Sequence, residues 1–425
     1  MWDNFGLRGN PFEINAVEKE GIIPLSTFVG RTEDRSKLRN TISTRSRSLS
    51  LIVGEKGVGK TSLGNVARFD LFEEYFTPIT EIDCQSEWTA SDFIIQIIGT
   101  LYEQEETAKL YSDLPKSFIK TAEELHKELR SLFLDESSGF NIQGGVGLAN
   151  IGGGYSHSMK INRYTMNSLK IKFKRLMNII TNNYKGLILQ FNNLDNLELD
   201  PKRLSQILAD LRDFLLTDKA HFIFLGNKAI EGSFKDNPKV GDCISSDIQL
   251  GSLQYDEILK ILTRRYEIFR IQNRTIIPPV HEEAVKLVYH LYNGNIRHIF
   301  YSLDKAVVNS EEILKSPLHT LKAEETQKVL YQLGNNRLTE GIQPRAASIL
   351  LYMINKNKEV TNAEIARRFK IKTQNTSKYL KQLKDNNLIT NIDYGSREVY
   401  YKIVEEAKWL LLEPPKGQQG YIAET

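Results

Sequence analysis

The chain has 425 residues, of which 40% are hydrophobic and 26% charged, and its formal net charge is +3. This length predicts two or three domains with packed cores, and the small net charge alone says little about partners. No run of about 18 apolar residues and no signal peptide is evident, so we expect a cytoplasmic protein without a membrane span. The two cysteines, Cys84 and Cys243, are far apart, which argues against a disulfide scaffold and a zinc site.

The N-terminal arm is aromatic and rich in turn-forming residues. Trp2–Phe12 reads as a strap packed on the folded domain. Further along, Phe28-Val-Gly-Arg31 precedes Thr32, which we expect to cap a helix that runs through Ile42.

A phosphate-binding motif follows this arm. The segment Leu49–Ser62 reads Leu-Ser-Leu-Ile-Val-Gly-Glu-Lys-Gly-Val-Gly-Lys-Thr-Ser. Its apolar start predicts a buried parallel strand, and a helix is expected from Ser62 to about Tyr75. Between them lies the spacing Gly-x-x-x-x-Gly-Lys-Thr of a P-loop. Glycines let such a loop point several backbone N–H groups at phosphate oxygens, and the helix N-terminus adds its dipole.

Each residue of the P-loop has an expected role. Lys60 reaches the β- and γ-phosphates, and the Thr61 hydroxyl holds Mg²⁺. The residues predicted to bind the nucleotide through this loop are Gly54, Glu55, Lys56, Gly57, Val58, Gly59, Lys60, Thr61 and Ser62. The alternative is a glycine-rich turn without a ligand.

Apolar runs and amphipathic segments alternate through the next part of the chain. The predicted strands and helices are Ile79–Asp83, Ala90–Tyr102, Lys116–Leu134, Gly186–Phe191 and His221–Gly226. This alternation predicts an α/β fold with a parallel sheet and helices on both faces. Ligands bind at the carboxyl ends of such strands, so Asn192–Asp195 and Asn227 are candidate functional residues.

A glycine-rich insertion, at about residues 135–160, separates two of these strands. Ser137–Tyr155 contains seven glycines, and its apolar residues are spaced mostly by two. This spacing fits a hairpin with one apolar face, which would contact a partner protein, DNA or another copy of the chain. A flexible linker is the alternative.

Together these features resemble the AAA+ ATPases, specifically the replication-initiator branch of origin-recognition and cell-division-cycle proteins and its signalling relatives, the STAND proteins. The segments that carry the resemblance are Phe28–Arg31, the P-loop, Phe191–Asp195, Leu225–Asn227 and Gly294–Arg297. It covers most of the chain from Trp2 to about Ser310. It implies a nucleotide-binding core over residues 1–250 and a helical lid over residues 251–335.

The resemblance also implies roles for single residues. ATP with Mg²⁺ is the expected ligand, and Val29 and Gly30 are expected beside its base. Asn227 resembles the sensor-1 residue that reads the γ-phosphate. Arg297 resembles the sensor-2 arginine, which grips phosphate with two parallel hydrogen bonds. A surface ion pair is the alternative for Arg297.

Two departures from the family pattern concern catalysis. Asn192 and Asn193 stand where the Walker B site has an aspartate for Mg²⁺ and a following acidic or amide residue. Asparagine is a poorer ligand for a hard cation and cannot act as a general base. Asp195, three residues after Asn192, is a candidate for partial substitution, but we expect its side chain to point elsewhere. No arginine lies between Arg212 and Arg264, where the family has its arginine finger. We therefore expect ATP to be bound well and hydrolysed slowly or not at all.

The C-terminal part is the basic part of the chain. From Glu340 to Lys408 it has 13 Lys and Arg against 8 Asp and Glu. Its predicted helices and strands are Pro344–Ile354, Ala363–Phe369, Gln374–Asn386, Leu388–Ile392 and Arg397–Ile403. Thr361-Asn-Ala-Glu364 is a capping pattern for the second helix. This order resembles a winged helix-turn-helix over residues 340–411, followed by a tail over residues 412–425.

The third of these helices is the expected recognition helix, which enters the DNA major groove. The residues expected to contact DNA from this helix and from the wing are Lys372, Gln374, Asn375, Ser377, Lys378, Lys381 and Arg397. Amide side chains read adenine edges, whereas lysine and serine hold phosphates. Double-stranded DNA is therefore the expected partner. The alternative is a winged helix that contacts only protein.

These inferences favour an initiator-type protein in which ATP biases a conformation or an assembly that DNA or a partner senses. The first alternative is an active DNA-stimulated motor or loader, in which Asp195 rescues metal binding. The second is a STAND-like signalling or defence scaffold whose winged helix and glycine-rich hairpin bind protein.

Overall fold

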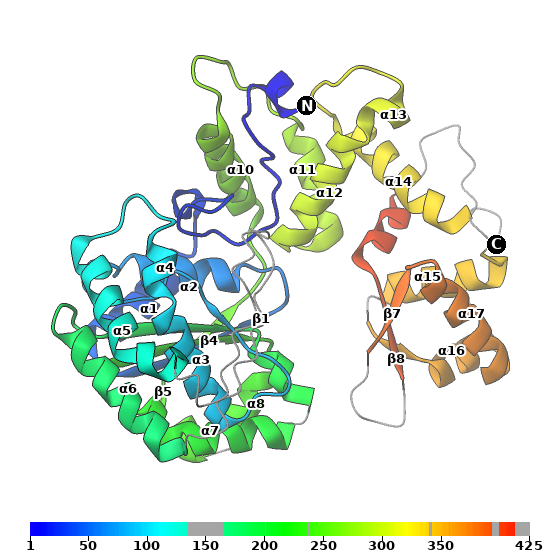
Figure 1. The fold of residues 1–425 in the computed structure, drawn as a ribbon. Helices are drawn as coiled ribbons and strands as arrows, with labels where there is room; N and C mark the ends of the chain where they lie inside the picture. The colour runs from blue at the N-terminus through cyan, green and yellow to red at the C-terminus, as the bar shows by residue number, and fades with distance from the viewer. Residues whose placement is uncertain are drawn as a thin grey trace. The chain divides into compact units, whose positions relative to one another are not determined.

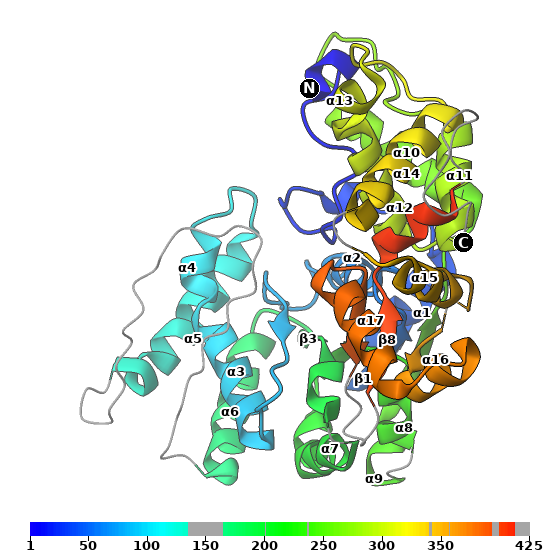
Figure 2. The ribbon, with the colours of Figure 1, turned by 90° about the vertical axis from the view of Figure 1, so that its right-hand side faces the viewer.

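The computed structural model describes residues 1–134, 165–199, 201–235, 238–339, 342–356, 358–392 and 399–412. The predicted glycine-rich hairpin, Arg397 and residues 413–425 lie outside this part of the chain. No helix within the described ranges is long and apolar enough to cross a membrane. The chain forms two compact units, Asn15–Gly251 and a second that combines Met1–Ile14 with Ser252–Thr425. Figures 1 and 2 show both units, which are described one at a time.

The unit Asn15–Gly251 is built on a five-stranded parallel sheet. Its strands are β1 (Ser48–Gly54), β2 (Ile82–Asp83), β3 (Leu187–Asn192), β4 (Ala220–Gly226) and β5 (Ile244–Leu250), in the spatial order β2-β3-β4-β1-β5. The predicted parallel α/β sheet is confirmed. Sequence analysis missed β5, because this edge strand alternates apolar with polar residues instead of forming a continuous apolar run.

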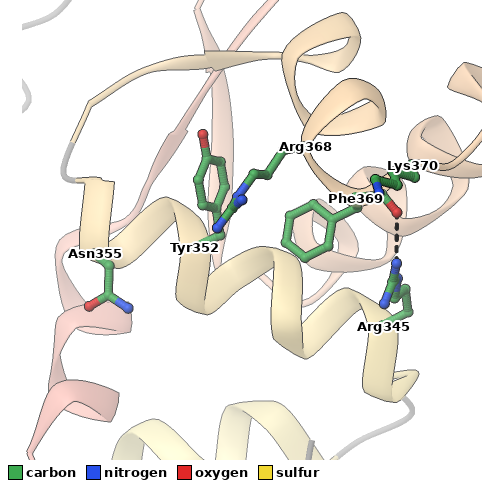
Figure 3. Close-up of a pocket in the computed structure, with 6 residues that line it drawn as sticks. All are labelled: Arg345, Tyr352, Asn355, Arg368, Phe369 and Lys370. Atoms are coloured by element: carbon green, nitrogen blue, oxygen red, sulfur yellow. Dashed lines mark hydrogen bonds between the residues drawn. The ribbon is translucent and has the colours of Figure 1, made fainter.

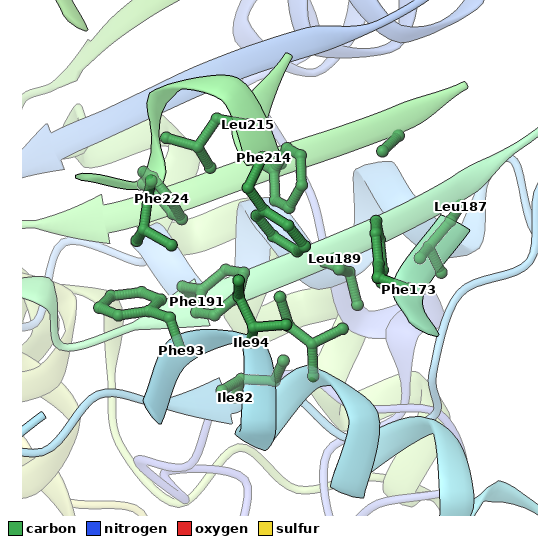
Figure 4. Close-up of a cluster of buried hydrophobic side chains, with 14 of the residues drawn as sticks. Ile82, Phe93, Ile94, Phe173, Leu187, Leu189, Phe191, Phe214, Leu215 and Phe224 are labelled. Atoms are coloured by element: carbon green, nitrogen blue, oxygen red, sulfur yellow. The ribbon is translucent and has the colours of Figure 1, made fainter. Parts of the chain in front are cut away.

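Helices cover both faces of this sheet. They are α1 (Thr32–Thr44), α2 (Lys60–Phe69), α3 (Ala90–Tyr102), α4 (Gln104–Ala108), α5 (Lys116–Leu134), α6 (Met166–Thr181), α7 (Pro201–Leu215), α8 (Ala229–Lys235) and α9 (Pro238–Gly241). Alternate strand residues point to opposite faces. Ile188 and Ile223 therefore pack in the cluster under α1 and α2. Phe191 and Phe224 pack in the larger cluster with Phe93 of α3, which Figure 4 shows.

Three local predictions need correction. Thr32 is the first residue of α1 and not its cap, since Arg31 precedes the helix with a positive φ of 54°. Helix α2 begins at Lys60, earlier than predicted, and ends at Phe69 instead of near Tyr75. Strand β2 is confined to Ile82–Asp83 and is shorter than predicted. The Ile79 N–H donates to Gln104 Oε1 at 2.9 Å, so this N–H does not pair with a neighbouring strand.

The second unit begins with a set of helices that the N-terminal arm packs against. These helices are α10 (Tyr255–Phe269), α11 (Glu282–Tyr292), α12 (Ile296–Val308), α13 (Ser310–Leu314) and α14 (Ala323–Thr339). The buried Arg265 guanidinium donates to the carbonyls of Pro11 at 3.0 Å and Glu13 at 2.6 Å, and lies over the Phe300 ring. The N-terminal strap thus packs on the helical region through backbone carbonyls and through buried side chains such as Phe12, whose ring contacts Phe300.

The rest of this unit is a winged helix, as predicted. Its elements are α15 (Pro344–Lys356), β6 (Val360–Thr361), α16 (Asn362–Phe369), α17 (Thr373–Asp385), β7 (Ile389–Ile392), β8 (Tyr400–Ile403) and the 3₁₀ helix η5 (Glu405–Leu411). The strands form an antiparallel sheet in the order β6-β8-β7. Thr361 caps α16 by accepting from the Glu364 N–H at 3.2 Å, which confirms the capping pattern.

The segment η5 joins the winged helix to the helical region. Trp409 is 2% exposed, stacks on Tyr301 of α12, and its indole N–H donates to Ser302 Oγ at 2.9 Å. Ser302 in turn donates to the Tyr292 hydroxyl at 3.2 Å, and that hydroxyl donates to the Glu405 carbonyl at 3.0 Å. A buried hydrogen-bond chain therefore starts and ends in η5.

This arrangement makes Trp409 a stability determinant of the unit. We expect Trp409→Ala to lower the free energy of unfolding by about 3–5 kcal/mol, because it leaves a large cavity and breaks the hydrogen bond to Ser302. Leu411→Ala is the matched control, since Leu411 lies in the same segment but is exposed; its effect should stay within about 0.5 kcal/mol. Urea unfolding followed by circular dichroism measures both. An equal loss of unfolding free energy in the two variants would contradict the role of Trp409 as a stability determinant.

Candidate nucleotide and DNA sites

The P-loop of the unit Asn15–Gly251 has the geometry of an anion cradle. Gly57 and Gly59 have φ angles of 90° and 94°, which disfavour any residue with a side chain. The first backbone bond into α2 runs from Leu63 N–H to Gly59 O at 3.0 Å, and no side chain caps the helix. The N–H groups at the start of α2 therefore have no intrahelical acceptor, and with the helix dipole they favour a bound anion.

The charged and hydroxyl groups of this loop are positioned from α2. Lys60 Nζ donates to the carbonyls of Gly54 and Glu55 at 2.9 Å each, so the ammonium lies over the loop. Thr61 is half-buried in the first turn. The Ser62 hydroxyl accepts from the Val17 N–H at 3.2 Å. Since that hydroxyl binds the N-terminal segment, a contact of Ser62 with phosphate would use its backbone N–H.

The segment that contains Val29 and Gly30 runs beside the P-loop. Arg31, which follows it, donates from Nη2 to the Val58 carbonyl at 3.4 Å and to the Gly251 carbonyl at 2.5 Å. Phe28, which precedes it, packs on the cluster that contains Val58. The segment is therefore anchored at both ends next to the loop, and its contact with a base stays a prediction.

The two asparagines predicted to take the Walker B position lie at the carboxyl end of β3. Asn192 is 8% exposed, and its Oδ1 accepts from Gln190 Nε2 at 3.0 Å. Asn193 follows with a positive φ of 55° and is exposed. Its Nδ2 donates to Oδ1 of Asp83 at 3.0 Å. The structure thus adds Asp83 to this edge, a residue that sequence analysis had placed only at the end of a strand.

Electrostatics set Asp83 apart from an ordinary surface carboxylate. Burial raises the pKa of its carboxyl, the nearby Glu81 charge raises it further, and hydrogen bonds from Asn192 and Asn193 act in the opposite direction. Asp195 lies in the 3₁₀ helix η4 (Leu194–Leu199), with Oδ1 near Gly226 of β4. The same reasoning that selected Asn192 from a strand end would have selected Asp83.

The two predicted sensor residues lie in different units. Asn227 follows β4, and its Oδ1 accepts from the N–H groups of Ala229 at 2.8 Å and Ile230 at 3.3 Å. It therefore caps α8, which leaves its amide N–H groups as donors toward a ligand. Arg297 is half-buried in the first turn of α12, in the other unit. Its contact with phosphate stays a prediction.

The predicted DNA-binding residues of helix α17 share one property, exposure to solvent. Those exposed are Lys372, Gln374, Asn375, Ser377, Lys378 and Lys381. Thr376, Leu380 and Leu383 of the same helix are buried in the winged-helix core or against it. The Ser377 hydroxyl accepts from Asn362 Nδ2 at 2.5 Å and donates to the Thr373 carbonyl at 3.1 Å. Ser377 thus also ties α17 to α16.

A shallow pocket of about 520 Å³ lies on the winged helix between α15 and the end of α16. Figure 3 shows its lining residues, Arg345, Tyr352, Asn355, Arg368, Phe369 and Lys370. Arg345 donates to the Phe369 carbonyl at 2.8 Å and lies over its ring, while Arg368 lies over the Tyr352 ring. These contacts join α15 to α16, and the two arginines add positive charge to the helix-turn-helix.

Strand order, P-loop and C-terminal domain together define an α/β P-loop fold combined with a winged helix-turn-helix. The family model described as the MarR family matches residues 340–393 of the chain. No curated protein matches the sequence. The predicted fold class, a P-loop core with a C-terminal winged helix, is therefore confirmed.

Solved structures similar to this chain include two ORC proteins and a Walker-type ATPase. The ORC2 protein of Aeropyrum pernix is 12% identical, with 95% of this chain and 96% of that chain covered and a TM-score of 0.47. The ORC1 protein of Aeropyrum pernix in complex with DNA is 12% identical, with 91% and 93% covered and a TM-score of 0.45. A Walker-type ATPase of Pyrococcus abyssi is 15% identical, with 95% and 99% covered and a TM-score of 0.48.

Proposed function

We propose that this chain is an ATP-binding and DNA-binding protein of the initiator type, in which ATP acts as a conformational or assembly switch and is hydrolysed slowly. The observation that carries this proposal is the P-loop, whose two left-handed glycines and uncapped helix α2 form an anion cradle under Lys60. In this proposal residues 1–250 bind the nucleotide, residues 251–335 form a lid, and residues 340–411 bind DNA.

The side chains around the loop suit a nucleotide with Mg²⁺. The N–H groups of Gly57, Gly59 and Lys60 and the Lys60 ammonium hold phosphates, and Val29 and Gly30 contact the base. Thr61 holds the metal, and oxygen atoms are the ligands that Mg²⁺ prefers. When bound, Mg²⁺ neutralises part of the phosphate charge. Gln190 Oε1, which is buried next to Gly64 of α2, has no hydrogen-bond donor among the described residues. This oxygen is therefore an acceptor that still needs a donor or a cation.

Slow hydrolysis follows from the chemistry of β3. Asn192 and Asn193 cannot take a proton from water, because an amide is not a base at neutral pH. The sequence also lacks an arginine between Arg212 and Arg264 to stabilise charge on a transferring phosphate. ATP would then persist in the site and act as a clamp, with Asn227 and Arg297 reading its γ-phosphate.

The DNA-binding half of the proposal rests on α17 and on charge. The helix exposes three lysines and two amide side chains, Gln374 and Asn375, and belongs to the region with an excess of five basic residues. Lysines bind the DNA backbone with a strong dependence on salt, and amides read base edges. The DNA complex solved for ORC1 of Aeropyrum pernix is a property of that protein and motivates the test here.

The test is the identity of the nucleotide that stays bound. We expect the purified chain, incubated with ATP and Mg²⁺ and then desalted, to retain intact ATP with and without duplex DNA, measured by chromatography of the released nucleotide. Rapid conversion to ADP, faster with DNA, would favour the active motor. Retained ATP without salt-sensitive DNA binding would favour the signalling scaffold. Absence of any bound nucleotide would refute the switch.

A further inference from the structure

The carboxyl ends of β2 and β3 place a carboxylate directly beside the two Walker B asparagines. Asp83 and Asn192 are paired in register, and the Cys84 N–H donates to the Asn192 carbonyl at 3.0 Å. The Asp83 carboxylate accepts from Asn193 Nδ2 at 3.0 Å, and its in-register pairing places it on the same face of the sheet as the Asn192 side chain. The strand that should carry an acid thus carries two amides, and the neighbouring strand carries the acid.

A continuous set of contacts leads from this carboxylate to the helix of the P-loop. Gln190 and Asn192 point to the face of β3 that α2 covers, since they alternate with Phe191 of the opposite cluster. Gln190 lies so close to Gly64 of α2 that a Cβ there would be 2.6 Å from Gln190 Oε1. Gln190 donates to Asn192, and Asn192 is paired in register with Asp83 on the neighbouring strand. Asp83 is therefore connected to α2 one turn after Lys60 and Thr61.

We propose that Asp83 is the acidic residue that positions Mg²⁺ beside ATP in this chain, in place of the aspartate missing at Asn192. This inference rests on the proposed function. It names Asp83 as the residue that makes ATP binding dependent on Mg²⁺. Asn193 holds the carboxylate in place, because its amide N–H₂ donates to an ionised acceptor. An ionised oxygen satisfies a hard cation better than an amide.

Asp195 is the competing acid, and the structure separates the two. Its Oδ1 lies 3.3 Å from the position of a Cβ on Gly226, toward β4 and the cap of α8. Both carboxylates flank Cys84, whose thiol pKa is raised by burial and then by the charges of Asp83 and Asp195. Asp83 is paired in register with Asn192 and accepts from Asn193, whereas Asp195 lies beside Gly226, so Asp83 is the acid that borders both asparagines.

The experiment measures ATP affinity by calorimetry with Mg²⁺ and with EDTA, together with Mn²⁺ binding in the presence of ATP by electron paramagnetic resonance. We expect Asp83→Asn to lower metal affinity by about ten- to hundredfold while ATP affinity in EDTA stays unchanged. The double variant Asp83→Asn/Asn192→Asp places a carboxylate on β3 instead of β2. It should restore most of the metal affinity that Asp83→Asn loses. Glu87→Gln is the matched control, because it removes the same charge from an exposed residue four positions away.

The results distinguish the inference from the proposed function. If Asp83→Asn binds the metal as tightly as the unaltered chain, the role of Asp83 is overturned while ATP binding stays intact. A loss of metal affinity in Asp195→Asn instead would overturn it in the same way. Failure of the unaltered chain to bind ATP in either condition would refute the proposed function itself. ATP affinity in EDTA and the thermal midpoint report whether Asp83→Asn still folds, and the rescue by the double variant would exclude a purely structural loss.

Discussion

Lys60→Ala should lower the affinity for ATP by about 10- to 150-fold, which corresponds to the roughly 1.5–3 kcal/mol of a hydrogen bond made by a charged donor. The physical reason is the position of this ammonium, which donates to the loop carbonyls of Gly54 and Glu55. Phosphate oxygens would replace these neutral acceptors with ionised ones. Calorimetry with ATP and Mg²⁺ measures the change.

The control for this variant is Lys109→Ala. Lys109 is an exposed lysine that directly follows α4 and pairs with Glu106 at 2.6 Å, far from the P-loop in sequence. Its removal should leave ATP affinity unchanged. A thermal melt without nucleotide checks that Lys60→Ala still folds, since the variant also loses two local hydrogen bonds. ATP affinity equal to that of the unaltered chain would refute the assignment of the loop as the nucleotide site.

The second large effect is expected at the recognition helix. Lys378→Ala/Lys381→Ala should lower the affinity for duplex DNA by about 30-fold at 0.15 M salt if each lysine binds one phosphate. Each contact contributes about 0.9 to the slope of log affinity against log salt, so the slope should fall by about two. Both lysines are exposed, so stability should change by less than about 0.5 kcal/mol. Fluorescence anisotropy over a salt series measures affinity and slope together.

The matched control removes the same charge from the helical region. Lys315→Ala/Lys322→Ala eliminates two exposed lysines of the same unit, so net charge falls equally. If both double variants weaken DNA binding to the same extent, attraction is a general charge effect and α17 is not the recognition helix. If the unaltered chain shows no salt-dependent DNA binding, the winged helix serves a protein partner and the scaffold alternative is favoured.

Several elements followed from local pattern because the pattern and the environment agree. The bounds of α3 and α5 match the prediction, and β1, β3 and β4 lie within a residue or two of theirs. These are amphipathic helices and continuous apolar strands, which have the same period in any surroundings. Elements whose backbone depends on distant partners were missed or misjudged. The edge strand β5 and the short β2, where Gln104 binds Ile79, are examples.

The amino-acid sequence alone determined the P-loop, the order of α/β elements and the basic helix-turn-helix, because glycine spacing, apolar period and charge are local properties. The tertiary structure decided which strand end supplies an acid. Asp83 and Asn193 are more than a hundred residues apart and meet at 3.0 Å only because β2 and β3 are neighbours in the sheet. It also decided that the N-terminal arm packs on the helices around Arg265. A buried guanidinium needs hydrogen-bond acceptors, and that of Arg265 donates to the backbone carbonyls of Pro11 and Glu13.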